Sequence, residues 1–202
     1  VTDSGEITAR KIVLTQGAWL GATLQKLDVS LELTVRKEQY LFFKALAANE
    51  FVTGRFPIFC EYNALGDDLD IQFYGFPIFE NRSAMKMAFH QTGPITSAER
   101  RNFAIEEDRK QQLISFVERR FPEKFGEVVD GKTCLYTNTA DRDFVFDFLP
   151  GRTDILVLSA CSGHGFKFAP LFGKMAERLL RSEGHDDPLE VFSIERFAGI
   201  PR

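Results

Sequence analysis

The chain has 202 residues, of which 44% are apolar, and its 29 acidic and 25 basic side chains give a net charge of -4. This apolar share excludes a disordered or low-complexity protein, and no run approaches the roughly 20 apolar residues of a membrane-spanning helix. The chain has no block rich in Lys and Arg, which argues against nucleic-acid binding. Its three cysteines and three histidines lack the spacing of a zinc site or a disulfide framework, so we expect no bound metal and a reducing cytoplasm. The start at Val1 without Met suggests a fragment.

The first part of the chain predicts strands joined by turns. β-Branched residues indicate a strand at 7–15, Gly17 breaks it, and a short helical turn carrying Leu20 and Leu24 follows. Thr96 or Ser97 could cap a short helix. The other expected elements are a long half-buried strand at 29–43, a loop or short helix at 45–56, strands at 57–62 and 69–76 around the turn-rich segment 63–68, and a strand at 84–90.

The second part predicts two longer helices and four short strands. A helix at 106–121 has acidic residues in its first turn and apolar residues at helical spacing, and Pro122 and Gly126 end it. The other expected elements are strands at 128–136, 144–148 and 155–160, a long helix from about 166 to 181 stopped by Gly184, and a final strand at 190–194. This order indicates only a mixed α and β class, a sheet with few helices.

Residues 154–168 form the strongest local signal, an apolar strand followed by a turn with two glycines and then a helix. Gly163 and Gly165 would let the backbone approach a ligand, and a helix start offers unpaired N–H groups to an anion. The dinucleotide fingerprint is not present, because Phe168 replaces its third glycine. Lys167 in a first helical turn opposes the helix dipole by a few tenths to about 1 kcal/mol, which a nearby anion would offset. A tight turn with a solvated Lys167 is an equally good interpretation.

Two further positions carry side chains that can do chemistry. Alternation places Lys86 and His90 on one face of a strand, roughly 13 Å apart, with only the small Ala88 between them. This face either meets water, the commoner case for an antiparallel strand, or lines a pocket. Cys134 lies in an alternating strand, where a cysteine is usually a small buried hydrophobe. A reactive role would need a lowered thiol pKa or a covalent partner.

Six segments carry more specific residue patterns. They are ARKIVLTQGAW near the start, YGFP at 74–77, the strand with Lys86 and His90, CLYTNTADRDFVFD at 134–147, SGHGFKFAP at 162–170 and FSIERF near the end. In this order they resemble the C-terminal half of the monomeric sarcosine oxidase and N-methyltryptophan oxidase group, within the glycine/D-amino-acid oxidase family of flavoproteins. The resemblance spans nearly the whole chain, and the combination of SGHGFKFAP with CLYTNTADRDFVFD is quite specific.

The resemblance implies an α+β fold. Segments 1–28 and 127–202 would form the C-terminal part of an incomplete Rossmann-like FAD-binding domain, and 29–126 a mostly antiparallel substrate-binding sheet flanked by helices. It also implies FAD-dependent oxidation of a secondary (N-methyl or cyclic) amino acid, with oxygen as the acceptor and hydrogen peroxide as a product. The GxGxxG turn of the family and its arginine for the substrate carboxylate do not occur here, so the chain is expected to need an N-terminal half and to be nearly inert alone.

The resemblance also assigns roles to individual residues. Cys134 would carry FAD through a thioether to the flavin 8α carbon, and Lys86 would contact flavin N5 through water and promote the reaction with oxygen. Lys167 would help hold the substrate carboxylate. The implied catalytic residues are Lys86, Lys167 and His90; the implied cofactor-binding residues are Cys134, Tyr136, Thr137, Gly163, His164, Gly165 and Lys167; the implied substrate contacts are Tyr74, His90, Tyr136 and Lys167.

Three departures from the family pattern leave the substrate open. ADRD at 140–143 replaces a usual Pro-Asp pair, Cys161 stands where an aromatic residue is common, and Lys37-Glu38 stands where Arg-Gln is usual. Two other readings of the chain are a truncated module that serves as a subunit or oligomerisation piece, and a dehydrogenase of the same family that does not use oxygen. The retained Cys134 and the two lysines favour the oxidase.

Overall fold

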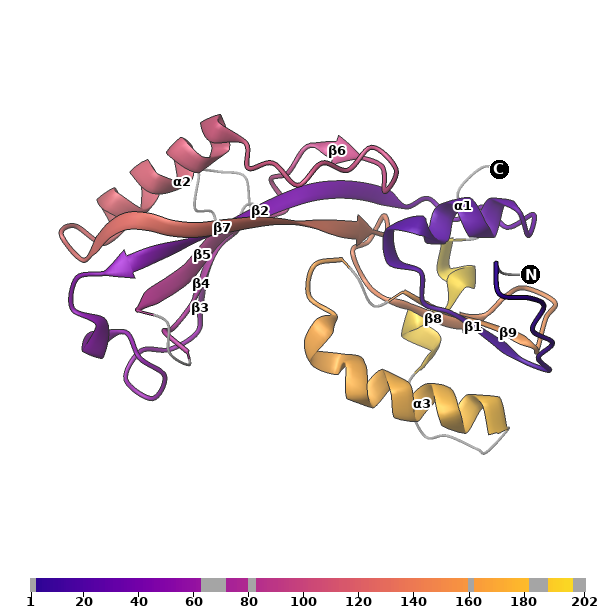
Figure 1. The fold of residues 1–202 in the computed structure, drawn as a ribbon. Helices are drawn as coiled ribbons and strands as arrows, with labels where there is room; N and C mark the ends of the chain where they lie inside the picture. The colour runs from indigo at the N-terminus through magenta and orange to yellow at the C-terminus, as the bar shows by residue number, and fades with distance from the viewer. Residues whose placement is uncertain (1–2, 63–71, 80–82, 160–161, 182–188, 198–202) are drawn as a thin grey trace. The chain divides into compact units, whose positions relative to one another are not determined.

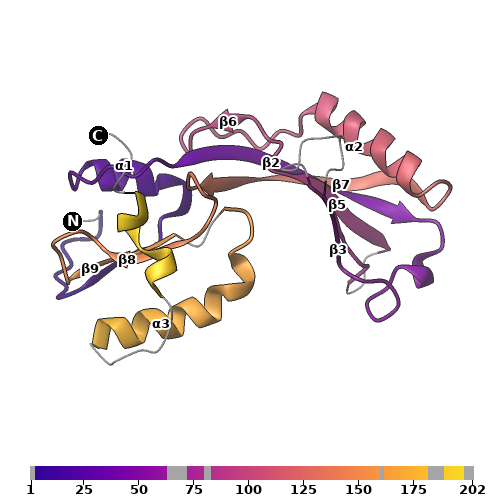
Figure 2. The same ribbon diagram turned by 180° about the vertical axis from the view of Figure 1, so that it is seen from behind.

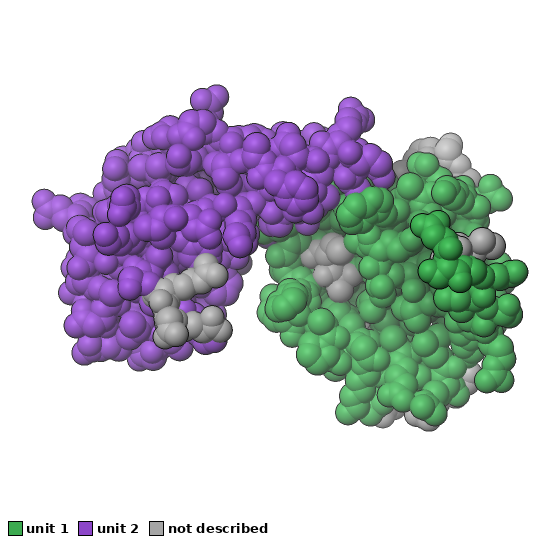
Figure 3. All heavy atoms as spheres, viewed as in Figure 1, with its two compact units in different colours: residues 1–35, 136–202 green, residues 36–135 purple. Residues whose placement is uncertain are grey.

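The computed structural model describes residues 3–62, 72–79, 83–159, 162–181 and 189–197, and Figures 1 and 2 show it from two sides. The chain divides into two compact units, residues 1–35 with 136–202 and residues 36–135, coloured separately in Figure 3. We call them unit 1 and unit 2. Both boundaries fall inside long strands, β2 (Thr34–Ala45) and β7 (Phe125–Asn138), further along the chain than the expected boundaries at 28 and 126. The assignment of the segments to FAD and to substrate stays a prediction.

Unit 1 contains a three-stranded sheet in the order β1–β9–β8. β1 (Ile12–Leu14) runs parallel to β9 (Ile155–Ser159), and β8 (Val145–Phe148) runs antiparallel to β9. The helices of this unit are η1 (Gly17–Trp19), α1 (Leu20–Gln25), η3 (Phe166–Phe168), α3 (Ala169–Arg181), η4 (Leu189–Phe192) and η5 (Ile194–Phe197).

The two faces of the unit 1 sheet pack against different helices. Val157 belongs to a core with Leu20 and Leu24 of α1, whereas its neighbour Leu156 belongs to a core with Phe172 of α3. Both faces of β9 are therefore buried, which explains why this strand has a continuous apolar run instead of an alternating one.

Unit 2 contains a six-stranded sheet in the order β3–β4–β5–β2–β6, with β7 also paired to β2. Helix α2 (Glu107–Arg120) covers one face and buries Leu113, Phe116 and Val117 against Phe73 and Met87 of the sheet (Figure 2). The remaining elements are β3 (Phe59–Tyr62), β4 (Gln72–Phe76), β5 (Ala84–His90), β6 (Ile95–Thr96) and the short η2 (Ala48–Glu50). The pairings of β3 with β4, β4 with β5, and β5 with β2 are antiparallel.

Most expected elements are confirmed, with ends that differ by a few residues. The strands predicted at 84–90 and 128–136 are β5 and β7, and the helix predicted at 106–121 is α2. Two strands are shorter than expected. β1 covers only part of the range 7–15, and β2 begins at Thr34 instead of at residue 29. The turn at 63–68, Cys161 and Gly184 lie outside the described residues.

The final strand expected at 190–194 is wrong, because this segment forms the 3-10 turns η4 and η5. The carboxylate of Asp147 accepts hydrogen bonds from Ser193 Oγ at 2.6 Å and from Ile194 N at 3.0 Å. The N–H of Ser193 donates to the carbonyl of Glu190. These turn-type bonds use backbone groups that a strand would need for pairing.

The prediction of a short helix capped by Thr96 or Ser97 is also wrong. Thr96 ends β6, and Ser97 Oγ accepts a hydrogen bond from the Arg100 backbone N–H in a turn. Gln39 Oε1 accepts from Glu106 N at 3.0 Å, and Gln39 Nε2 donates to Glu106 O at 3.3 Å. The segment before α2 is thus tied to β2 by side-chain bonds instead of folding on itself.

Candidate functional site

Lys86 lies in the middle of β5 in unit 2, surrounded by aromatic rings. Its Nζ lies 4.1 Å from the centre of the Tyr40 ring, 5.2 Å from that of Phe76 and 5.8 Å from that of Tyr74. Burial lowers the pKa of Lys86, and the nearby Cys134 thiol opposes this shift. Among the described residues, no carboxylate forms an ion pair with Lys86. The result is a half-buried cation held by ring faces instead of by an anion.

Cys134 is a free, half-buried thiol on β7 in the same unit. Burial raises its pKa, the charge of Glu38 raises it further, and Lys86 and Arg101 act in the opposite direction. The lowered pKa that marks an activated thiol is therefore not found in this environment. Cys60, the other described cysteine, is exposed.

Glu38 links β2 to the Gly93 backbone and to Arg109 of α2, and sequence reasoning singled it out only as a departure from a family pattern. It is 2% exposed, and its carboxylate accepts hydrogen bonds from Gly93 N at 2.7 Å and from Arg109 at 3.2 Å. Burial raises the pKa of Glu38, and these hydrogen bonds partly offset that effect. The signal that could have found it is the run of four polar residues at 36–39 inside a strand that contains Val35 and the apolar run at 41–43.

Tyr74 and His90 lie on the same sheet face as Lys86. Tyr74 pairs with Ala88 across β4 and β5, and its ring centre is 6.3 Å from that of His90. Both Lys86 and His90 are half-buried, so this face of β5 is not a fully solvated one. The neighbouring Tyr40 was missed, although its place two residues before Phe42 in an alternating strand was a usable signal.

In unit 1, the turn after β9 contains backbone that favours glycine. Ser162 has φ +32° and Gly163 has φ +80°, whereas Gly165 has φ -80° in the ordinary right-handed region. Ser162 N donates to Thr137 O at 3.0 Å, which joins the turn to the end of β7. Only one of the two predicted glycines is therefore required by the backbone.

His164 and Lys167 are held by local carbonyl groups. His164 Nε2 lies 3.2 Å from the Arg142 carbonyl oxygen, which can only accept a hydrogen bond. Its ring centre is 4.6 Å from that of Phe144. Lys167 Nζ donates to the carbonyl of His164 at 3.0 Å.

The expected place of Lys167 in the first turn of a long helix is wrong. Phe168 N donates to Gly165 O, so residues 166–168 form the 3-10 turn η3, and α3 begins only at Ala169. Lys167 therefore lies before α3, and the hydrogen bond that it donates to the His164 carbonyl stabilises its ammonium group locally.

The predicted site residues fall into two groups, each described within its own unit. Tyr136 and Thr137 are buried at the end of β7 in unit 1. The group on unit 2 is Tyr74, Lys86, His90 and Cys134, and the group on unit 1 is Tyr136, Thr137, Gly163, His164, Gly165 and Lys167. In the described parts of the chain, no cluster of three or more His, Cys, Asp or Glu residues could hold a metal ion, and no helix is long and apolar enough to span a membrane.

Residues 1–179 match the protein family described as FAD dependent oxidoreductase. Over 98% of its length the chain is 31% identical to monomeric sarcosine oxidase of Bacillus sp. (strain NS-129) and 34% identical to N-methyl-L-tryptophan oxidase of Salmonella agona (strain SL483). It covers 50% of each of these proteins, so it spans about half the length of the curated relatives that it matches.

The fold is similar to that of glycine oxidase from Geobacillus kaustophilus, with a TM-score of 0.70 and 16% sequence identity over 96% of this chain and 47% of that chain. This similarity confirms the α+β class expected from the sequence. The family match over residues 1–179 shows that the chain belongs to the FAD dependent oxidoreductase family.

Proposed function

We propose that this chain supplies the flavin-ring and substrate residues of an oxidase for secondary amino acids, either N-methylated or cyclic, with oxygen as acceptor and hydrogen peroxide as product. The observation that carries the proposal is Lys86, a half-buried cation without a carboxylate partner among the described residues, whose charge acts on the Cys134 thiol. The names of the relatives support the substrate class. Because the chain spans about half their length, the activity is proposed for the enzyme that contains it, with the pyrophosphate turn supplied by an N-terminal half.

The residues of unit 2 fit a flavin ring chemically. Tyr40 and Tyr74 offer aromatic surface, Lys86 offers a positive charge that has no carboxylate partner in the described parts of the chain, and Cys134 offers a thiol. FAD, when bound, accepts a hydride from the C–H bond next to the amine nitrogen and passes two electrons to oxygen, while water hydrolyses the resulting imine.

Lys86 is the residue we propose to promote the oxygen reaction. Negative charge develops on oxygen as it takes up electrons, and a fixed cation in a low-dielectric site stabilises that charge. The lowered pKa of Lys86 reflects the burial that also strengthens this effect.

Cys134 is the residue we propose to bind the flavin covalently. With FAD bound, Cys134 would hold it through an S–C bond to the 8α carbon; the thiol and the 8α methyl group would each give up one proton, and oxygen would accept the two electrons. The thiol must lose its proton before attack, because the thiolate is the nucleophile. Burial raises the pKa of Cys134 and opposes this loss, whereas the nearby Lys86 and Arg101 charges favour it.

On unit 1, we propose that Gly163, His164 and Gly165 present the turn to the flavin pyrimidine ring. Lys167 would bind the substrate carboxylate, exchanging its bond to the His164 carbonyl for a charged partner. The substrate contacts proposed in addition are Tyr74, His90 and Tyr136. The proposed compartment is the cytoplasm, in keeping with the free thiols of Cys60 and Cys134.

Anaerobic mixing of the FAD-loaded enzyme with sarcosine and with proline tests the proposal. The flavin absorbance should bleach with at least one secondary amino acid, and admission of oxygen should restore it with one hydrogen peroxide per flavin. Glycine, a primary amine, is the control for secondary-amine specificity. Absence of bleaching with every secondary amino acid tested contradicts the proposal, and bleaching without recovery in oxygen identifies a dehydrogenase.

A further inference from the structure

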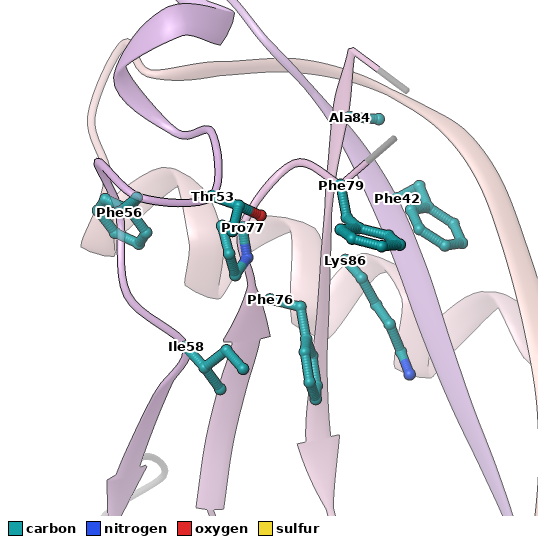
Figure 4. A pocket seen from close by; sticks show the side chains of 9 residues that line it. All are labelled: Phe42, Thr53, Phe56, Ile58, Phe76, Pro77, Phe79, Ala84 and Lys86. Atoms are coloured by element: carbon teal, nitrogen blue, oxygen red, sulfur yellow. The ribbon is translucent and has the colours of Figure 1, made fainter. Parts of the chain in front are cut away.

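Unit 2 contains a pocket of about 560 Å³ beside Lys86, on the sheet face opposite α2 (Figure 4). Its volume lies within the range of roughly 300–1,000 Å³ that is typical of small-molecule sites. The residues that line it come from β2, β4, β5 and the segments around β3 and β4. They are Phe42, Thr53, Phe56, Ile58, Phe76, Pro77, Phe79, Ala84 and Lys86.

The walls of this pocket are almost entirely apolar. Four phenylalanine rings contribute to them, and Lys86 is the charged residue among those that line the pocket. In Figure 4 the Lys86 side chain extends away from Ala84 and Phe79, so that its methylene groups lie nearest to them and its nitrogen lies furthest. The pocket therefore offers the aliphatic part of this lysine to a ligand, while the ammonium group lies over the Tyr40 ring.

The sheet face changes from apolar to polar along β5, starting at the pocket. Phe42 and Phe76 both pair with Lys86, so the three lie in one row across the sheet. Further along β5, Ala88 pairs with Tyr74 and His90 pairs with Gln72. A molecule with one apolar end and one polar end would match this gradient, with Lys86 at the boundary.

We propose that this pocket holds the side chain of the amino acid substrate, and that the substrate is a secondary amino acid with an uncharged side chain as large as an aromatic ring. The proposal rests on the proposed function, in which Tyr74 and His90, on the same sheet face as Lys86, contact the substrate. The amine end of the substrate then lies toward Tyr74 and His90, where polar partners are present. Lys86 repels a cationic side chain. An acidic side chain would lose its hydration on entering the pocket, and the phenylalanine rings there donate no hydrogen bond to replace it.

The first test compares substrates in the FAD-loaded enzyme. N-methyl-L-phenylalanine should have a kcat/KM about 10-fold or more above that of sarcosine, because the pocket binds the added ring. N-methyl-L-glutamate should not exceed sarcosine. A kcat/KM for N-methyl-L-phenylalanine equal to or below that of sarcosine, or a preference for the glutamate derivative, overturns the proposal.

The second test narrows the pocket without touching the residues proposed for catalysis. Ile58 lines the pocket and is 65% exposed, so Ile58→Trp adds volume there at little cost to folding. The matched control is Ile95→Trp, because Ile95 is 69% exposed in the same unit and does not line the pocket. Ile58→Trp should lower kcat/KM for N-methyl-L-phenylalanine about 10-fold and leave that for sarcosine within about twofold. An equal loss for both substrates contradicts the proposal.

A third measurement does not depend on turnover. 3-Phenylpropanoate carries the ring and the carboxylate but has no amine to oxidise, and propanoate lacks the ring. Titration followed by flavin absorbance should give a Kd about 10-fold lower for 3-phenylpropanoate, and Ile58→Trp but not Ile95→Trp should remove the difference. Equal Kd values overturn the pocket proposal, whereas failure of every secondary amino acid to reduce the flavin overturns the proposed function alone.

Discussion

The Nζ atom of Lys86 lies 4.1 Å from the centre of the Tyr40 ring, on a neighbouring strand of the same sheet. The ring face stabilises the ammonium group but does not neutralise its charge, whereas a carboxylate would neutralise it. The charge therefore remains available to act on its surroundings, among them the Cys134 thiol. The relationship between a lysine and a tyrosine on adjacent strands is the structural basis for the role proposed for Lys86.

Replacement of Lys86 by Met should slow oxidation of the reduced flavin by about 100-fold, because a preorganised charge that stabilises a developing anion is worth that much in other enzymes. Stopped-flow mixing of the reduced enzyme with oxygen measures this rate. Lys86→Arg keeps the charge and is the control, and it should retain most of the rate. An oxygen reaction unchanged in Lys86→Met removes Lys86 from the mechanism.

Replacement of Cys134 by Ser should leave all flavin in the supernatant after acid precipitation, whereas the wild-type pellet should stay yellow. Peptide mass spectrometry should locate the flavin on the Cys134 peptide. Since burial raises the pKa of this thiol, the rate of attachment should increase with pH through and above the usual thiol range. Cys60→Ser, which removes the exposed thiol, is the control, and loss of covalent flavin in that variant instead would refute the assignment.

Replacement of Arg109 by Met should lower the free energy of unfolding by about 3 kcal/mol, because it leaves the Glu38 carboxylate buried without its charged partner. Urea denaturation measures this loss. The control is Lys110→Met on the next position of α2, where the ion pair with Glu107 lies at the surface and its removal should cost less. Equal losses in the two variants would contradict a special role for the buried pair.

Asp141 should titrate far below an ordinary carboxyl group. The Arg196 guanidinium hydrogen-bonds to it at 2.7 Å and lowers the pKa of Asp141 to about 2, with help from Asp143 N and Thr139 Oγ1. A folded-state pKa below the unfolded value of about 3.9 means that the stabilisation is present above that value and is lost as pH falls toward 2. NMR titration of the Asp141 side chain measures the pKa.

The same titration in an Arg196→Met variant gives the matching control. The pKa of Asp141 should move up toward its usual range, because the largest cause of the shift has been removed. A pKa that stays near 2 would assign the shift to the loop N–H and hydroxyl donors instead.

Replacement of Gly163 by Ala should destabilise unit 1 by about 1–2 kcal/mol, because Gly163 has φ +80° and a side chain is strained there. Gly165→Ala is the matched control two residues later, where φ is -80° and Ala adopts the same backbone without strain. Chemical denaturation compares the two variants. Similar stabilities would contradict the assignment of the left-handed turn to Gly163.

The sequence predicted those features that local patterns control. Alternation placed Lys86 and His90 on one face of β5, and helical spacing of apolar residues located α2. The strand-turn-helix at 154–168 was also found, although the helix begins later than expected, at Ala169. The motifs at 134–147 and 162–170 indicated the flavoprotein family that the match over 1–179 shows.

Long-range contacts decided the rest. The segment at 190–194 looks like a strand by composition, but the distant Asp147 carboxylate binds Ser193 and Ile194 and holds it in turns. Nothing in the residues around Ser193 reports that contact.

By itself, the sequence thus determined the fold class, most strands and helices, and which residues share a face of β5. Only the tertiary structure decided what surrounds Lys86, because the register of β2, β4 and β5 sets Phe42 and Phe76 beside it and leaves an apolar pocket open. It also decided that Glu38 is buried against Arg109. Periodicity along one strand fixes the direction of a side chain, whereas its neighbours depend on pairing between strands that are distant in the chain.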